Sequence, residues 1–151
     1  MDKSTFDSVI DFAVKKENAA ESFYKDLAAR PPLKQYASFF LETAAAESGH
    51  AKKLLSVQKG GKAPELPQTL INENGITDVI PMVSPGDFSS FYDVLVFCAQ
   101  EEERSVKLYQ DMAAKVSDSE LKSLFTSLAE EEKKHKLGFE DEFNNAKGLE
   151  Y

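Results

Sequence analysis

Apolar residues recur every three or four positions along four long stretches of the sequence, the spacing of one face of an α-helix. The series in the first stretch is Phe6, Ile10, Ala13, Ala20, Tyr24 and Leu27. Proline and glycine pairs interrupt the chain between stretches, at Pro31-Pro32 and at Gly60-Gly61. The pattern therefore predicts four helices, over residues 4–29, 33–58, 88–115 and 118–145.

The connections set the topology. Short turns near Pro31-Pro32 and near Ser117 predict two antiparallel helix pairs, and Ser117 with Glu120 resembles a capping box at the start of the fourth helix. The long link over residues 60–87 can cross the height of a helix of about 25 residues, which is on the order of 38 Å. We expect one all-α domain over residues 1–151, an antiparallel four-helix bundle with one long crossover connection.

The two helix pairs repeat one another. Sliding the first pair onto the second at one constant offset aligns Tyr24 with Tyr109 and Phe40 with Phe125 without a gap. The same offset aligns three further pairs, Glu17 with Glu102, Glu47 with Glu132, and His50 with His135. The halves therefore read as a duplicated helical hairpin, with a pseudo-two-fold axis through the bundle.

Polar residues interrupt each apolar series at mid-helix. They are Glu17, Glu47, His50, Glu102, Glu132 and His135. Four unpaired carboxylates in a core would cost several kcal/mol each, and the nearby cations Lys16 and Arg104 are expected on other faces. Two divalent cations would balance the four negative charges. Oxygen and imidazole ligands without thiolate suit Fe, Mn or Zn, and a Glu from each of two helices with Glu-x-x-His from each of the others is the di-metal carboxylate arrangement.

Other acidic residues near these positions are expected at the protein surface rather than in the metal site. A run of charges on a helix is usually a solvated face, and the members of the two glutamate runs assigned to that face are Glu101, Glu103, Glu130 and Glu131. Glu21 lies beside the interior series and is expected near the site or at the surface.

The motifs together resemble the rubrerythrins of the ferritin-like superfamily. They are KENAAESFY (Lys16 to Tyr24, with Glu17), ESGH (Glu47 to His50), EERSVKLY (Glu102 to Tyr109) and EKKH (Glu132 to His135). The resemblance implies two irons, with Glu47 and Glu132 bridging them and Glu17 and Glu102 as terminal ligands. By the same resemblance His50 and His135 each bind one metal, and Tyr24 and Tyr109 donate hydrogen bonds to ligating carboxylates.

Two departures from that family affect the expected chemistry. Full-length members carry a rubredoxin module with four cysteines, whereas Cys98 is the only cysteine here, so we expect an external electron donor such as a rubredoxin-like protein. Peroxidase-type members also carry an extra glutamate one turn after the residue matching Glu102, where this chain has Ser105. Glu101 or Glu103 would need a local bulge to replace it. Cys98 is expected to be a small buried apolar residue, with modulation of the site as the alternative.

Charge and composition exclude several classes. The chain holds 26 acidic and 18 basic residues, a net charge of -8, which argues against nucleic acid or an anionic membrane as partner. One cysteine allows neither an internal disulfide nor a zinc ribbon. No long apolar stretch suggests a signal peptide or membrane span, so a cytoplasmic protein is expected.

The leading functional hypothesis is a rubrerythrin-like di-iron protein that reduces hydrogen peroxide or dioxygen in oxidative-stress defence. A ferritin-type ferroxidase or iron-handling protein would share the same ligands, and a metal-free interaction bundle is the third class. The resemblance and an aromatic-rich face at Phe39, Phe88 and Phe97 favour a homodimer.

Overall fold

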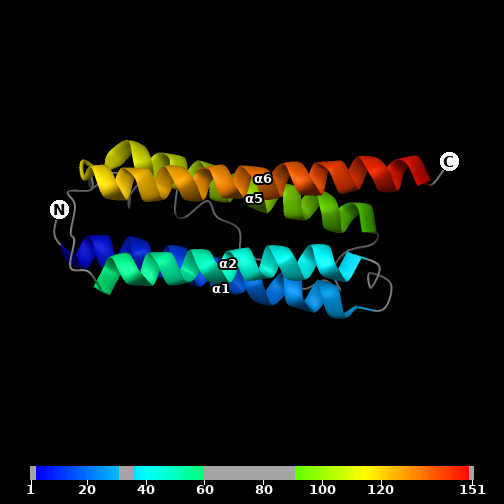
Figure 1. The fold of residues 1–151 in the computed structure, drawn as a ribbon, viewed down its shortest axis with the longest axis horizontal. Coiled ribbons are helices and arrows are strands. Elements are labelled where there is room, and N and C mark those ends of the chain that lie inside the picture. The colour runs from blue at the N-terminus through cyan, green and yellow to red at the C-terminus, as the bar shows by residue number, and fades with distance from the viewer. Residues whose placement is uncertain (1–2, 31–35, 60–90, 150–151) are drawn as a thin grey trace.

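The described part of the protein, residues 3–30, 36–59 and 91–149 of a computed structural model, consists of four long α-helices (Figure 1). The helices are α1 (Lys3–Ala29), α2 (Ala37–Lys59), α5 (Phe91–Lys115) and α6 (Ser119–Leu149). The closest packing joins α1 to α2 and α5 to α6, as two antiparallel hairpins. The all-α bundle predicted from the apolar spacing is therefore confirmed.

The direction of the helices explains the need for a long connection. Helices α2 and α5 run the same way, so the end of α2 and the start of α5 lie at opposite ends of the bundle (Figure 1). The predicted crossover over residues 60–87 lies outside the described residues, as do the predicted helix starts at residues 33 and 88. The helix ends at Ala29, Lys59 and Lys115 fall within one residue of the prediction, whereas α6 continues to Leu149.

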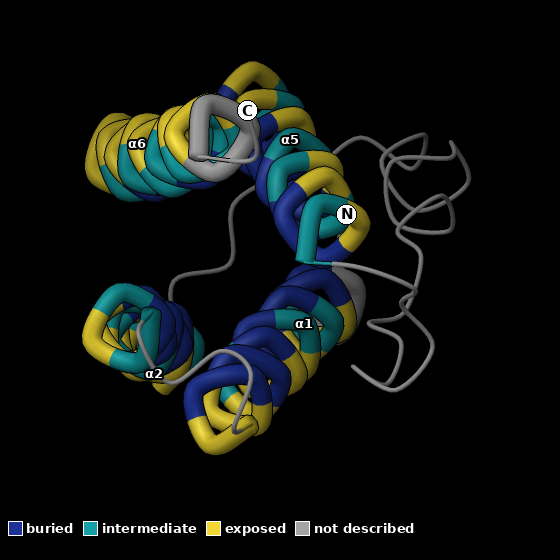
Figure 2. The backbone as a smooth tube through the Cα atoms, turned by 90° about the vertical axis from the view of Figure 1, so that its right-hand side faces the viewer, coloured by how far each residue is buried: buried dark blue, intermediate teal, exposed yellow. Residues whose placement is uncertain are grey.

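Buried residues lie along the inward faces of the helices, as the backbone coloured by burial shows end-on in Figure 2. They form two apolar clusters, one toward each end of the bundle. The first includes Phe6, Ile10, Leu54, Tyr109, Met112 and Phe125. The second includes Phe23, Tyr24, Phe40, Leu95, Cys98 and Phe139. Between them lie the mid-helix polar residues, which are therefore enclosed by apolar packing on both sides.

Aromatic rings fill the second cluster. Tyr24 stacks on Phe139 with ring centroids 5.5 Å apart, and Phe39 meets the same Phe139 edge-on at 5.1 Å. Phe97 packs against Phe23 at 5.6 Å. Phe39 and Phe97, expected on a shared outer face, thus contribute to packing within the chain, while Phe88 lies outside the described residues. The homodimer stays a prediction.

None of the helices in the described ranges is long and apolar enough to cross a membrane.

The start of α6 differs from the prediction. Asp118, and not Ser117, provides the cap, because its Oδ1 accepts a hydrogen bond of 3.0 Å from the backbone N–H of Leu121. The Asp118 carbonyl also accepts the N–H of Lys122 at 2.9 Å, the first bond of the helical ladder. The capping box starting at Ser117 was therefore wrong by one residue.

Replacing this cap should cost stability without disturbing the fold. We expect Asp118→Ala to lower the free energy of unfolding by about 1 kcal/mol, because one backbone N–H loses its partner. Ser117→Ala is the matched control and should have less than half that effect. Urea denaturation followed by circular dichroism measures both, and a larger loss for Ser117→Ala would contradict the assignment.

Candidate metal centre

The six predicted residues converge between the two apolar clusters. Each helix contributes at mid-length: α1 gives Glu17, α5 gives Glu102, and α2 and α6 each give a Glu-x-x-His pair. Residues three apart on a helix share one face, so each histidine lies beside the glutamate of its own helix. All four glutamates and His50 are buried, and His135 is partly buried.

The six side chains form two groups that share two members. Glu17, Glu47, His50 and Glu132 bring one potential ligand atom each to within 4.8 Å of one another. Glu47, Glu102, Glu132 and His135 do the same. Glu47 and Glu132 thus lie in both groups, as expected of bridging carboxylates.

Each histidine faces the glutamate of the opposite hairpin. The Nδ1 atom of His50 lies 3.1 Å from Oε1 of Glu132, and Nδ1 of His135 lies 3.1 Å from Oε1 of Glu47. The two imidazole rings are nearly parallel, 18° apart, with centroids separated by 6.0 Å. The pseudo-two-fold relation expected from the sequence repeat therefore holds at the site.

The atoms that face the middle of the site lack hydrogen-bond partners within the described residues. They are Glu17 Oε2, Glu47 Oε1, His50 Nδ1, Glu102 Oε2, both carboxylate oxygens of Glu132, and His135 Nδ1. Buried polar atoms normally have partners, so a group of such orphans at one spot indicates a cation site. Carboxylate oxygen and imidazole nitrogen are the donors that iron, manganese and zinc accept, so the residues fit two divalent cations.

Two tyrosines fix the remaining carboxylate oxygens. The Tyr24 hydroxyl donates a 2.6 Å hydrogen bond to Oε1 of Glu102, and the Tyr109 hydroxyl donates one of 2.5 Å to Oε1 of Glu17. Each tyrosine thus holds the glutamate of the other hairpin and leaves that glutamate's Oε2 facing the site. Burial, with the nearby glutamate charges, raises the pKa of both phenols well above the usual value, so they remain hydrogen-bond donors.

The histidines are strongly basic without a metal. Burial alone would lower the pKa of His50, but its approach to the carboxylates of Glu132 and Glu17 outweighs burial and raises the pKa to about 10. His135 likewise reaches a pKa of about 10 through Glu102 and Glu132. Burial raises the pKa of Glu102 to about 7, with the charge of Glu132 adding to it. Protons therefore do part of the neutralisation that a cation would do.

Two members of the glutamate runs differ from expectation. Glu101, predicted on a solvated face, is buried, and its Oε1 pairs with Arg104 Nη1 at 2.6 Å. Glu131 is only partly exposed, and its Oε2 contacts His50 Nε2 at 2.7 Å. The prediction holds better for the other two, because Glu130 is exposed and Glu103 is partly exposed and pairs with Lys136 at 2.8 Å.

Lys16 and Arg104, expected on other helix faces, each contact a buried residue near the site. Lys16 Nζ donates a hydrogen bond of 2.5 Å to Oγ of Ser105, a buried position of the interior series. Arg104 neutralises Glu101, and neither cation forms an ion pair with the six predicted residues among the contacts of the described chain. Glu21 pairs with Lys25 at 2.7 Å and is not among the ligand groups. Lysine and arginine side chains of the described residues therefore leave the charge of the site uncompensated.

Cys98 is buried in the second apolar cluster. Burial and the charges of Glu102 and Glu101 raise the pKa of its thiol well above the usual value. It is therefore a neutral thiol, as expected of a small apolar residue in the core.

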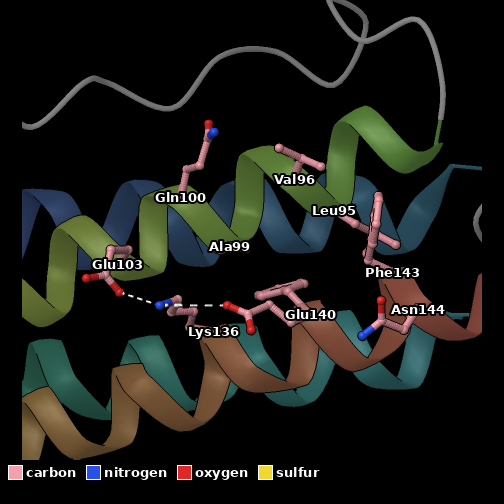
Figure 3. Close-up of a pocket in the computed structure, with 10 residues that line it drawn as sticks. Leu95, Val96, Ala99, Gln100, Glu103, Lys136, Glu140, Phe143 and Asn144 are labelled. Atoms are coloured by element: carbon pink, nitrogen blue, oxygen red, sulfur yellow. Dashed lines mark ion pairs between the residues drawn. The ribbon is translucent and has the colours of Figure 1, made fainter.

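A separate groove of about 390 Å³ lies between α5 and α6 (Figure 3). Leu95, Ala99 and Phe139 line it, and Lys136 lies between Glu103 and Glu140 at 2.8 and 3.7 Å. None of the six predicted residues lines this groove. The four glutamates and His50 of the candidate site are instead buried.

Fold and site together define a class: a four-helix bundle with a buried carboxylate–histidine cluster that is compatible with a di-metal centre. Residues 8–80 match the family model described as Rubrerythrin. This match is consistent with a rubrerythrin-like protein of the ferritin-like type, the family that the sequence motifs resemble. The matched range includes most of α1 and all of α2, and the repeat carries the same motif to α5 and α6. A comparison with curated proteins gave no match.

The metal-free protein should lose stability as the pH rises. A histidine whose folded pKa is about 10 stabilises the fold fully below its unfolded pKa of about 6.5, and this contribution disappears as the pH approaches 10. The raised pKa of Glu102 acts in the same direction between about 4.5 and 7. Urea midpoints of chelator-treated protein should fall steadily from pH 6.5 to about pH 10.

The double variant His50→Gln/His135→Gln is the control for that experiment, and its midpoint should depend much less on pH. A wild-type midpoint that is constant or rises over the same range would contradict the account of the site's charges.

Proposed function

We propose that this chain is a di-iron redox protein that reduces hydrogen peroxide or dioxygen. The observation that carries the proposal is the pair of four-residue groups that share Glu47 and Glu132. The rubrerythrin match over residues 8–80 supports iron as the metal, and manganese or zinc would suit the same donors. The proposed setting is the cytoplasm, in oxidative-stress defence.

The ligand assignment follows the two groups. Glu17 and His50 would hold one ion, Glu102 and His135 the other, and Glu47 and Glu132 both. When bound, two ferrous ions supply two electrons, which with two protons convert hydrogen peroxide to two waters and leave two ferric ions. The four carboxylates favour the more highly charged product because they carry four negative charges in a buried place.

The surrounding residues orient the ligands and keep water out. Tyr24 and Tyr109 each hold one carboxylate oxygen of Glu102 or Glu17, so the second oxygen keeps its direction when the charge of the site changes. The apolar clusters on either side exclude bulk water, which protects a reactive site from side reactions. Rings of Phe40 and Phe139 pack on Tyr24 and limit its rotation.

The electrons for repeated turnover would come from a separate molecule. Cys98 is the only cysteine of the chain and is buried, so the chain has no thiolate iron centre of its own. A rubredoxin-like protein or another small external reductant would return the ferric pair to the ferrous state, and a homodimer would be the working unit.

Rapid mixing tests the redox role. Anaerobic protein loaded with ferrous iron should oxidise on mixing with hydrogen peroxide, roughly 100-fold or more faster than a Glu47→Ala/His50→Ala variant, because loss of even an outer partner of a ligand costs about 10- to 100-fold. Stopped-flow absorbance of the ferric product measures the rate. Glu130→Ala, which removes an exposed carboxylate of the same helix as Glu132, is the matched control and should behave as wild type.

Equal rates for wild type and the ligand variant would contradict the redox role. Rapid oxidation by dioxygen, with release or storage of ferric iron and no repeated turnover of peroxide by added reductant, would instead favour the iron-handling alternative.

A further inference from the structure

The two imidazoles of the site differ in what their outer nitrogens meet. His50 turns Nδ1 toward Glu132 and places Nε2 2.7 Å from Oε2 of Glu131. Lys53 Nζ lies 3.9 Å from the same oxygen of Glu131. Both nitrogens of His50 therefore have an assigned neighbour, one within the site and one at its edge.

The outer nitrogen of His135, Nε2, forms no ion pair with a carboxylate of the described residues. The ion pairs of His135 among the described residues all run from Nδ1, to Glu47, Glu102 and Glu132. The sequence repeat gives the reason, because at its constant offset the counterpart of Glu131 is Ala46 and the counterpart of Lys53 is Gly138. Both charged residues that flank His50 are thus replaced by small residues around His135.

His135 is also more exposed to solvent than His50. The side chain of His135 is 17% exposed, against 3% for His50, although the two occupy equivalent positions in the repeat. The extra carboxylate of Glu131 lies over the outer edge of His50, and Ala46 cannot reach the corresponding place beside His135. The duplicated hairpins have therefore diverged at the edges of the two imidazoles.

A carboxylate on the outer nitrogen changes how an imidazole binds a metal. It holds the proton on Nε2, leaves the lone pair on Nδ1 facing the site, fixes the ring, and makes the ligating nitrogen a stronger donor. Removing such a partner typically costs about 10- to 100-fold in metal affinity.

We propose that Glu131 is a positioning residue for His50 and that it makes the two metal positions unequal. The position formed with Glu17 and His50 binds its ion first and more tightly than the position formed with Glu102 and His135. This inference rests on the proposed metal site, and it extends that proposal by giving an order of filling and the residue that sets it.

Anaerobic titration with Co²⁺ alone tests the inference, with visible absorption and calorimetry as readouts. Wild type should bind two ions in two steps. His50→Gln should lose the tight step and His135→Gln the weak one. Glu131→Ala should weaken the tight step by about 10- to 100-fold and change the weak step by less than about threefold.

Three further variants separate positioning from charge. Glu130→Ala removes the same charge one residue away and should leave both steps as in wild type. Glu131→Gln removes the charge but keeps a side-chain oxygen beside His50 Nε2, and it should recover a large part of the lost affinity. Ala46→Glu, which places a carboxylate at the equivalent position beside His135, should narrow the gap between the two steps. Circular dichroism checks that each variant is folded.

The outcomes are distinguishable. Binding of no Co²⁺ by wild type would overturn the metal site and this inference together. Two steps in wild type that Glu131→Ala leaves unchanged would overturn the inference alone. It would equally fall if Glu131→Ala lost no more affinity than Glu130→Ala, or if Glu131→Gln were as weak as Glu131→Ala.

Discussion

Burying negative charge without a permanent positive partner is the constraint on which this bundle depends. Glu17, Glu47, Glu102 and Glu132 lie at mid-helix between two apolar clusters, where several of their oxygens have no hydrogen-bond partner among the described residues. An unpaired charge in such a place costs several kcal/mol, so the fold is stable only if protons or cations neutralise the group. The basic histidines supply part of this when no metal is present. Two divalent cations would supply all of it and would link four helices at one point.

Duplication explains how one chain arranges such a site. One hairpin supplies a single Glu and a Glu-x-x-His pair, and the second hairpin supplies the same set at the same spacing. The pseudo-two-fold relation then brings each histidine against the Glu-x-x-His glutamate of the other hairpin. It also brings each tyrosine against the other hairpin's single mid-helix glutamate. Neither hairpin can form the site alone, because the tyrosine that bonds each of Glu17 and Glu102 comes from the other hairpin. The two hairpins differ at the edge of the site, where Glu131 of one corresponds to Ala46 of the other.

The sequence predicted the helices and the converging residues well because both depend on a regular period. Apolar spacing of three and four residues defines the inward face, and Glu and His at that spacing must point inward. The same reasoning failed where a helix is buried over a wider arc. Helix α5 packs so that Glu101 as well as Glu102 is buried, and only the position of Arg104 shows how Glu101 is neutralised. Glu131 lies at the edge of the face, and a contact with His50 on another helix leaves no periodic trace in the sequence.

The most direct test of the central claim is a crystal structure of protein loaded anaerobically with ferrous iron, with anomalous diffraction data collected at the iron edge. The account predicts two strong anomalous peaks between the apolar clusters, one beside His50 and one beside His135, with Glu47 and Glu132 in contact with both. A structure without iron between the helices, or with one ion held only by surface carboxylates, would contradict it.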